Sequence, residues 1–381
     1  MRRREANARV TPGTSGRGIR HWRFEAGRDG GMTKSAIRFW RQGYAKSTRT
    51  AYKRHFRRYG RWTAIRGITG DGVSERPQEA DLIFFAVFEA KRKMSPGYIK
   101  AELSAIAAGT IANGFKDPLR DDNNRYLPHL RRVMRGISRT CSKARRKRKP
   151  LTTDKLAAVG KFARRVTGSV YNAACLKAAL TLGVYALLRV SEMVSPKTTG
   201  HVPSKGMCVG DIEFLPSFEL ADRMVVTVKN SKSDPFRNGC DLKIFANGTE
   251  TCPVAAMKQW LRCRGRRDEQ GCLFKLSSGK LLTRPLLQKW MRAGLDLAGY
   301  KGEEHSTHSM RAGGAETLAA QGFDASTIQV LGRWASSAFL LYLKLGDSVR
   351  KQASKAMGRL KRQDVEFMAD RDKAINDSEW R

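Results

Sequence analysis

Four short segments of the chain contain residue types that could do chemistry. The first reads Leu187-Leu-Arg-Val-Ser-Glu192, where an arginine ends an apolar, helix-like run and a glutamate follows three residues later. An arginine at the end of a buried helix is costly unless it meets an anion, so Arg189 is expected to have a negatively charged partner. The alternative is a simple surface ion pair between Arg189 and Glu192.

The second segment spans residues 229–239 and reads KNSKSDPFRNG. It carries two lysines, Lys229 and Lys232, on the expected tip of a hairpin, although by itself it is also an ordinary polar turn. The third segment, His308-Ser-Met-Arg311, places a histidine and an arginine on one helical face, so both side chains can reach the same group. A lone histidine is more often structural, and His305 is a competing candidate.

The fourth segment spans residues 331–342 and reads LGRWASSAFLLY. It predicts a turn containing Trp334, followed by a helix that carries Tyr342. A buried tyrosine in a helix is more often a core residue than a nucleophile. None of the four segments identifies a reaction when it is taken alone.

The charge of the chain indicates the kind of partner. Among 381 residues, 73 are Lys or Arg and 35 are Asp or Glu, which gives a formal net charge of +38. Self-repulsion of this size is tolerated mainly when the partner is a polyanion, and nucleic acid is the usual one. This balance argues against a metabolic enzyme, while a hydrophobic content of 41% predicts a folded core.

Several other classes of protein are disfavoured by composition. The longest apolar run, at residues 178–188, is far shorter than the roughly 20 residues that span a bilayer, so no membrane segment is expected. Seven cysteines without a Cys-x-x-Cys pair argue against a disulfide framework and a zinc ribbon and predict reduced, intracellular thiols. The N-terminus resembles neither a signal nor a transit peptide, and Met1 or Met32 could be the start.

The helices and strands that must position these segments are predicted to form two domains. Residues 1–33, rich in Gly and Arg, predict a disordered basic arm, and residues 34–142 predict a small all-α domain. Its helices are expected from Ser47 or Thr48 as N-cap, across 82–93, across 96–114 and around 130–137. The first helix has a basic face that favours phosphate contact over simple solvation, with the candidates Arg49, Lys53, Arg54 and Arg57.

Residues 143–150 predict the boundary between the two domains, because six of the eight are basic and the last is proline. They are expected to form an exposed linker that also contacts phosphates, and a nuclear-import signal is a further possibility. The candidate phosphate ligands are Lys143, Arg145, Arg146, Lys147 and Arg148.

Residues 151–345 predict a second, mostly helical domain with one small antiparallel sheet. Helices are expected at about 152–166, 172–188, 254–265, 284–298, 309–321, 325–332 and 336–344. The strands are expected at 224–228 and 242–245, joined by the polar connection 229–239. Residues 346–381 carry an apolar stripe that predicts a C-terminal tail helix.

In this order and with these spacings, the four segments resemble the active-site motifs of the tyrosine recombinase (phage integrase) family. The likeness extends from Arg189 to Tyr342. It is especially close to Cre recombinase and to the recombinases of Crypton and DIRS-like mobile elements. The resemblance implies an all-α core-binding (SAM-like) domain and an α+β catalytic domain, mainly α with a small antiparallel sheet, which together form a DNA clamp. Gly313 and Gly314 depart from the bulkier residues usual after the His-x-x-Arg motif.

The resemblance also implies a role for each matched residue. Arg189 and Arg311 would clamp the scissile phosphate, whose charge builds up in the transition state. Tyr342 would attack phosphorus and form a 3′-phosphotyrosyl link, leaving a free 5′-hydroxyl.

The remaining roles concern protons and positioning. Lys232 would protonate the leaving oxygen, with Lys229 as the less favoured candidate, and His308 would serve in acid–base work and hold the phosphate. Trp334 would hydrogen-bond or buttress the pocket. Glu192 would orient Arg189 or His308.

The function that this resemblance implies is cleavage and rejoining of double-stranded DNA by a site-specific recombinase or integrase of a mobile element. Neither metal nor ATP is expected, since the phosphodiester energy is kept in the protein–DNA bond. The alternatives are a type IB topoisomerase and a non-catalytic DNA-binding protein derived from a recombinase. The tail helix would join protomers into a tetramer on DNA, or else pack on its own domain. A eukaryotic element would place the protein in the nucleus, and a bacterial or phage source in the cytoplasm on the nucleoid.

Overall fold

The computed structural model describes residues 35, 38–40, 42–141, 148–231, 234, 238–336 and 339–340. The chain divides into two compact units, Met1–Arg145 and Arg146–Arg381, and this division falls within the range 143–150 expected to be a linker. The arm, the tail helix and part of the linker lie outside the described residues. So do six of the residues singled out by sequence: Lys143, Arg145, Arg146, Lys147, Lys232 and Tyr342.

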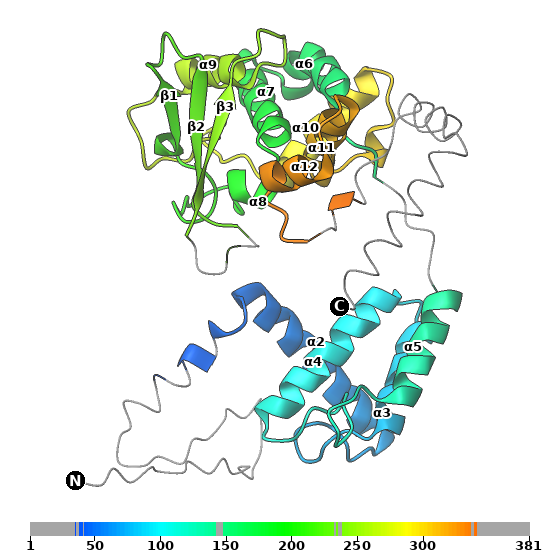
Figure 1. Ribbon diagram of the computed structural model, residues 1–381. Coiled ribbons are helices and arrows are strands. Elements are labelled where there is room, and N and C mark those ends of the chain that lie inside the picture. The colour runs from blue at the N-terminus through cyan, green and yellow to red at the C-terminus, as the bar shows by residue number, and fades with distance from the viewer. Residues whose placement is uncertain are drawn as a thin grey trace, which may run out of the picture. The chain divides into compact units, whose positions relative to one another are not determined.

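The first unit is all-α in its described part (Figure 1). Its helices are α2 (Lys46–Arg66), α3 (Glu79–Lys91), α4 (Pro96–Ala112) and α5 (Pro128–Thr140). They enclose one apolar core that includes Tyr59, Phe85, Leu103, Ile106 and Leu130. The prediction of a small helical domain here is therefore confirmed.

Helix α4 follows the sequence signals closely, whereas α2 does not. Pro96 occupies the first turn of α4, Ser95 accepts a hydrogen bond from the Tyr98 amide at 3.2 Å, and Gly114 has a positive φ of 90° just beyond the end. The expected N-cap of α2 at Ser47 or Thr48 is wrong, because the N-cap is Ala45 and no side chain caps the helix. The Tyr44 ring instead packs on Tyr52, with centroids 5.5 Å apart.

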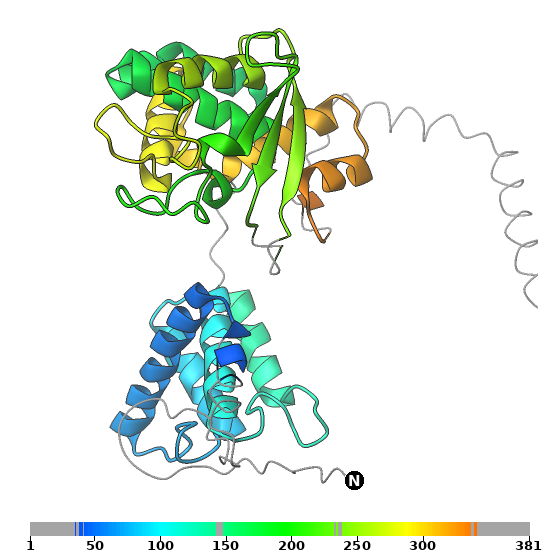
Figure 2. The ribbon, with the colours of Figure 1, turned by 90° about the vertical axis from the view of Figure 1, so that its left-hand side faces the viewer.

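The second unit packs seven helices and a three-stranded sheet in its described part (Figures 1 and 2). The helices are α6 (Thr153–Thr167), α7 (Val170–Tyr185), α8 (Val190–Met193), α9 (Pro253–Arg264), α10 (Arg284–Leu297), α11 (His308–Ala320) and α12 (Ala325–Gly332). Helix α7 is buried along most of its length and packs against α6, α9 and α11, so it forms the centre of this unit. None of the described helices is long and apolar enough to cross a membrane.

The sheet consists of β1 (Ile212–Leu215), β2 (Arg223–Val228) and β3 (Cys240–Phe245), all antiparallel in the order β1-β2-β3. The predicted hairpin is confirmed as β2 and β3, with Val226 opposite Leu242. Alternate residues of β2 are buried, as expected for a strand with one face on the core. Strand β1 was not predicted, because four residues are too few to display a clear period of two.

The helix expected at 172–188 is shorter than predicted. Helix α7 ends at Tyr185, Leu187 takes a positive φ of 49°, and the Leu188 amide turns back to donate to the Gly183 carbonyl at 3.2 Å. Leu187 and Leu188 are both buried, so their apolar character reflects this packed turn rather than more helix. Consequently Arg189 does not end a helix but is the N-cap of the short helix α8.

Candidate active site and cationic surface

Arg189 is held by the carboxylate three residues after it. Its backbone N–H donates to Glu192 Oε2 at 2.9 Å, and its Nη1 donates to Glu192 Oε1 at 2.9 Å. The Glu192 side chain is only 2% exposed, so the pair is not the surface ion pair considered from sequence. Of the two residues that Glu192 was expected to orient, it is Arg189 that Glu192 contacts.

The same carboxylate joins three parts of the second unit. Ser231, after the end of β2, donates to Glu192 Oε1 at 2.9 Å and accepts from Arg189 Nη1 at 2.6 Å. Arg333, which follows α12, places its Nη2 3.3 Å from Glu192 Oε2. The hairpin, α8 and the end of α12 therefore meet at Glu192.

Arg311 lies on α11, one turn after the helix begins, and is only 6% exposed. Its Nη2 donates to the Gly332 carbonyl, and its guanidinium carbon lies 4.4 Å from the centre of the Trp334 ring. Trp334 in turn stacks on Phe339, with centroids 5.4 Å apart. A guanidinium held against an aromatic face and largely removed from water interacts more strongly with any anion that reaches it.

The two candidate histidines differ in exposure. His308 is exposed and is the first residue of α11, at the N-terminal end of the helix that carries Arg311. His305 is 1% exposed, its Nδ1 lies 3.1 Å from the Lys301 carbonyl, and burial lowers its pKa. The geometry therefore favours His308 over His305 as a residue that can reach a ligand.

Lys229 is engaged away from Glu192. Its Nζ lies 2.5 Å from Asp211 Oδ1, and the Asp211 side chain is 5% exposed. Burial alone would lower the pKa of Lys229, but the hydrogen bond and ion pair with Asp211 outweigh it and raise that pKa. A lysine held in this way is a poor proton donor, which favours Lys232, the residue after Ser231.

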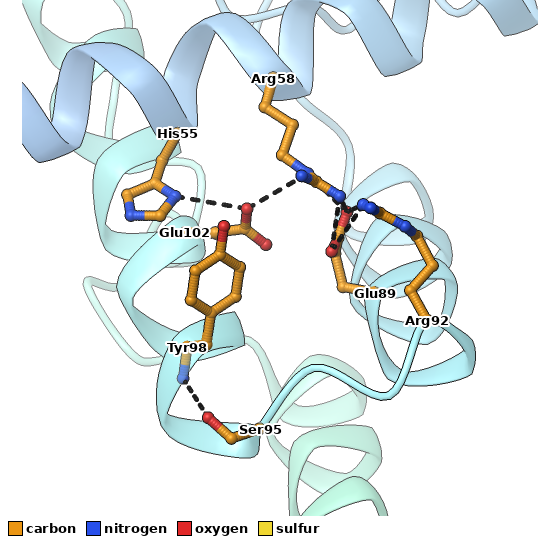
Figure 3. Close-up of polar contacts among 7 residues, drawn as sticks. All are labelled: His55, Arg58, Glu89, Arg92, Ser95, Tyr98 and Glu102. Atoms are coloured by element: carbon orange, nitrogen blue, oxygen red, sulfur yellow. Dashed lines mark hydrogen bonds and ion pairs between the residues drawn. The ribbon is translucent and has the colours of Figure 1, made fainter.

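The basic face of α2 is exposed at all four positions proposed from sequence, Arg49, Lys53, Arg54 and Arg57. Arg58, which shares the same run of cations, turns inward instead. Its Nε and Nη2 donate to the two oxygens of Glu89 at 2.8 and 3.0 Å (Figure 3). Arg58 therefore holds α2 to α3 and is not part of the cationic face of α2.

Figure 3 shows that Arg58 belongs to a cluster of polar side chains between α2, α3 and α4. Glu89 and Glu102 are both fully buried, and His55 Nδ1 lies 3.3 Å from Glu102 Oε1. Burial, reinforced by the charge of Glu89, raises the pKa of Glu102 to about 7, and burial also lowers the pKa of His55. The cluster joins three helices and leaves the exposed face of α2 to other cations.

A cationic groove between α4 and α5 was not proposed from sequence. It has a volume of about 740 Å³ and an apolar floor that includes Leu103 and Met134. Its cationic lining consists of Lys100, Arg131, Arg135 and Arg139. The i, i+4, i+8 spacing of the three arginines on one helix was the available signal, since it predicts a single basic stripe.

The described end of the linker is bound to the second unit. The Lys149 amide donates to the Glu304 carbonyl at 2.9 Å, and Lys149 Nζ lies 2.6 Å from Glu304 Oε2. Arg148 Nη1 donates to the Glu303 carbonyl at 2.5 Å. Arg148 is exposed, so part of its guanidinium faces solvent.

Among the described residues, no group of three or more His, Cys, Asp or Glu side chains has an arrangement that could hold a metal ion. All seven cysteines are free thiols.

The arrangement around Glu192 and Arg311 is cationic. It is built from guanidinium groups that are paired, stacked and partly desolvated. Such an arrangement suits an anion with several oxygens, such as a phosphodiester.

Comparison with known proteins identifies solved structures that share the architecture of this chain. No protein-family model and no curated protein sequence matches the chain. Among solved structures, the XerH site-specific recombinase bound to difH substrate in a pre-cleavage complex is 15% identical, with a TM-score of 0.52, covering 85% of this chain and 83% of that one. The Tn1549 transposon integrase in complex with circular intermediate DNA is 16% identical, with a TM-score of 0.52 and coverage of 84% and 97%.

A post-cleavage complex of XerH with a palindromic difH substrate is 17% identical, with a TM-score of 0.51 and coverage of 74% and 70%. The particular closeness to Cre recombinase and to Crypton and DIRS-like elements stays a prediction. At these identities the likeness concerns the architecture, and it agrees with the order of motifs in the sequence. The chain has the tyrosine recombinase fold.

Proposed function

We propose that this protein is a site-specific DNA recombinase or integrase of a mobile element. The observation that carries the proposal is a continuous series of contacts between the two candidate clamp arginines. Arg189 pairs with Glu192, Glu192 contacts Arg333, and the next residue, Trp334, lies over Arg311. Two guanidinium groups linked by these contacts would suit a scissile phosphate, and the similar structures named above are DNA complexes.

In the proposed reaction Tyr342 attacks the phosphorus of one strand. A bond forms between phosphorus and the phenolic oxygen, and the bond to the 5′-oxygen breaks. The phenolic proton of Tyr342 passes to His308, and Lys232 donates a proton to the leaving 5′-oxygen. Attack by a 5′-hydroxyl of a partner strand reverses these steps and releases the enzyme. Since the phosphotyrosyl bond keeps the energy of the phosphodiester, the scheme requires neither ATP nor a metal ion.

Duplex DNA would be held by exposed cations that take no part in the chemistry. Such cations lie on the exposed face of α2, in the groove between α4 and α5, and at Arg148 in the described end of the linker. Contacts to phosphates hold the duplex without reading its sequence. Because many such contacts share the binding, losing one of them should change the affinity for DNA only slightly. Residues 143–149 would also serve as a nuclear-import signal if the mobile element is eukaryotic.

The test of the proposed function is trapping of the covalent intermediate. Wild-type protein and the Tyr342→Phe variant are incubated with nicked suicide duplexes made from DNA that flanks the gene, in EDTA and without ATP. We expect a protein–DNA adduct that survives denaturant in the wild type and is absent from the variant. If the wild type binds these duplexes but forms an adduct with none of them, the result would favour a non-catalytic DNA-binding protein. Relaxation of supercoils without strand exchange would favour a topoisomerase.

Assembly is tested separately. We propose that residues 346–381 dock on a neighbouring protomer and that four protomers assemble on DNA. Light scattering of the complex with a duplex carrying the target site is compared for the full chain and for a truncation at Gly346. The truncated chain should give smaller assemblies, whereas unchanged assembly would mean that this segment packs on its own protomer.

A further inference from the structure

We propose that Arg333 is a positioning residue for DNA cleavage, acting on Arg189 through the shared carboxylate of Glu192. This inference rests on the proposed recombinase function and assigns a role to a residue of the fourth segment that received none from the sequence.

The backbone at Arg333 directs its side chain into the protein. Arg333 is the C-cap of α12 and has a left-handed conformation, with φ 55° and ψ 44°. An L-residue other than glycine pays on the order of 1 kcal/mol for this conformation, so contacts of the side chain must offset it. The turn is secured on both sides, since the Trp334 amide donates to the Gln329 carbonyl at 3.1 Å and Gln329 Nε2 donates to the Trp334 carbonyl at 3.0 Å.

The guanidinium of Arg333 reaches the turn that leads into Arg189. Its Nη1 lies 3.4 Å from the Ala186 carbonyl, and its Nη2 lies 3.5 Å from the Leu187 carbonyl and 3.3 Å from Glu192 Oε2. The side chain is 16% exposed. Arg333 thus links the end of α12 to the α7–α8 turn, and these two segments lie next to one another in Figure 1.

The charges at Glu192 explain what this link does. Glu192 Oε1 accepts from Arg189 Nη1 and from Ser231, and Oε2 accepts from the Arg189 amide and faces Arg333. Two guanidinium groups around one buried carboxylate leave a formal charge of +1, whereas Arg189 and Glu192 alone would sum to zero. Arg333 therefore offsets the charge of Glu192, so that Glu192 cancels less of the charge that Arg189 can present to a phosphate.

Arg333 also acts on the second clamp arginine through the chain. The left-handed turn at Arg333 is what brings the next residue, Trp334, over the Arg311 guanidinium at 4.4 Å. Arg333 thus acts on Arg189 through its side chain and on Arg311 through its backbone turn. Displacement of a positioned group by about 1 Å can cost a factor of about 100 in rate.

The experiment measures cleavage of the suicide duplex in a single turnover with enzyme in excess, together with the Kd for the same duplex. Arg333→Met should lower the cleavage rate by about 100-fold and change Kd by less than about threefold, because Arg333 acts on the reaction rather than on DNA binding. Arg333→Lys should recover part of the rate, since it restores the charge but not the planar guanidinium. The matched control is Arg264→Met, because the Arg264 side chain is 5% exposed and donates to the Cys272 carbonyl, away from Glu192.

The decisive variant is the double substitution Glu192→Gln with Arg333→Met. It restores the formal charge of +1 by removing the carboxylate that Arg333 neutralises, so its cleavage rate should exceed that of Arg333→Met alone. A purely structural role of Arg333 predicts the opposite, because a second buried polar contact is lost. The inference is overturned if Arg333→Met cleaves at the wild-type rate, or if the double variant cleaves more slowly than Arg333→Met. Absence of an adduct from the wild type contradicts the proposed function itself and, with it, this inference.

Discussion

Replacing Glu102 by glutamine should stabilise the first unit at alkaline pH, although Glu102 belongs to a network of ion pairs. Glu102 is fully buried between α2 and α4, and burial, reinforced by the charge of Glu89, raises its pKa from the ordinary 4.5 to about 7. Arg58 Nε lies 3.5 Å from Glu102 Oε1 and lowers this pKa, but it makes its close contacts with Glu89. The ionised form of Glu102 is therefore poorly compensated.

The sign and size of the effect follow from proton linkage. Below about pH 4.5 the carboxyl is protonated in both states, and between pH 4.5 and 7 only the unfolded chain releases the proton. The free energy of unfolding therefore falls as the pH rises through this window, and the loss is complete above pH 7. A difference between 4.5 and about 7 corresponds to roughly 3 kcal/mol, since each pKa unit is worth about 1.4 kcal/mol.

Glu102→Gln removes this titration. The variant should match the wild type at pH 4.5 and exceed its free energy of unfolding by up to roughly 3 kcal/mol at pH 8. Burial lowers the pKa of His55, so protonation of His55 destabilises the fold as the pH drops below its ordinary 6.5. At pH 8 His55 is neutral in both the folded and the unfolded chain, so this opposite contribution is absent where the two proteins should differ most.

The assay is urea unfolding of the full chain at pH values from 4.5 to 8, followed by hydrogen exchange in peptides from α4, which report on the first unit. Glu75→Gln is the control, because Glu75 is an exposed carboxylate of the same unit. It should leave the pH profile unchanged. A Glu102→Gln variant that is less stable than the wild type at pH 8, with the same dependence on pH, would show that Glu102 is ionised and well compensated when buried.

Three further predictions concern the second unit and the DNA-binding surface. Arg311→Ala should reduce adduct formation by about 1000-fold while changing duplex Kd by less than about threefold, because only one of many cations is lost; an equal loss of binding would contradict the assignment. Replacing Arg131, Arg135 and Arg139 by glutamine should make the slope of log K against log salt shallower by about 0.9 for each lost phosphate contact, and an unchanged slope would remove the groove from the DNA interface. Gly313→Ala should destabilise the second unit by about 3 kcal/mol or more in thermal unfolding, because its Cβ would overlap the Leu151 carbonyl; unchanged stability would mean that α11 can shift.

The parts of the fold that could be predicted from the sequence are those set by local chemistry. Proline at the first turn and glycine beyond the last residue define α4, since both effects act within a few residues. The β-branched residues at 225–228 indicate β2, and the order of the four chemical segments indicates the architecture. The end of α7 could not be predicted in this way. Leu187 and Leu188 continue the apolar run, and only packing of the chain around them requires a turn at Tyr185.

The candidate site was predictable in its residue types but not in its connections. The spacing of Arg189 and Glu192 fits an ion pair, and the structure adds that the carboxylate is buried and shared. The contact between Glu192 and Arg333 joins residues 141 positions apart, so no local pattern could reveal it. Arg58 is a similar case, since its neighbours in α2 are exposed cations while its own partner is Glu89, 31 residues away.

Burial separates the arginines of this chain into two groups that its net charge of +38 does not distinguish. An exposed arginine keeps its water and can be exchanged for another cation nearby, so DNA binding should tolerate its loss. A desolvated arginine such as Arg189 or Arg311 must have its charge balanced by a fixed acceptor or an aromatic face, and this fixes its position. A carboxylate that balances such a charge stabilises the fold. It also reduces the positive charge that the arginine can offer to a phosphate. A second guanidinium at the same carboxylate resolves this conflict, and Arg333 at Glu192 has the geometry to do so.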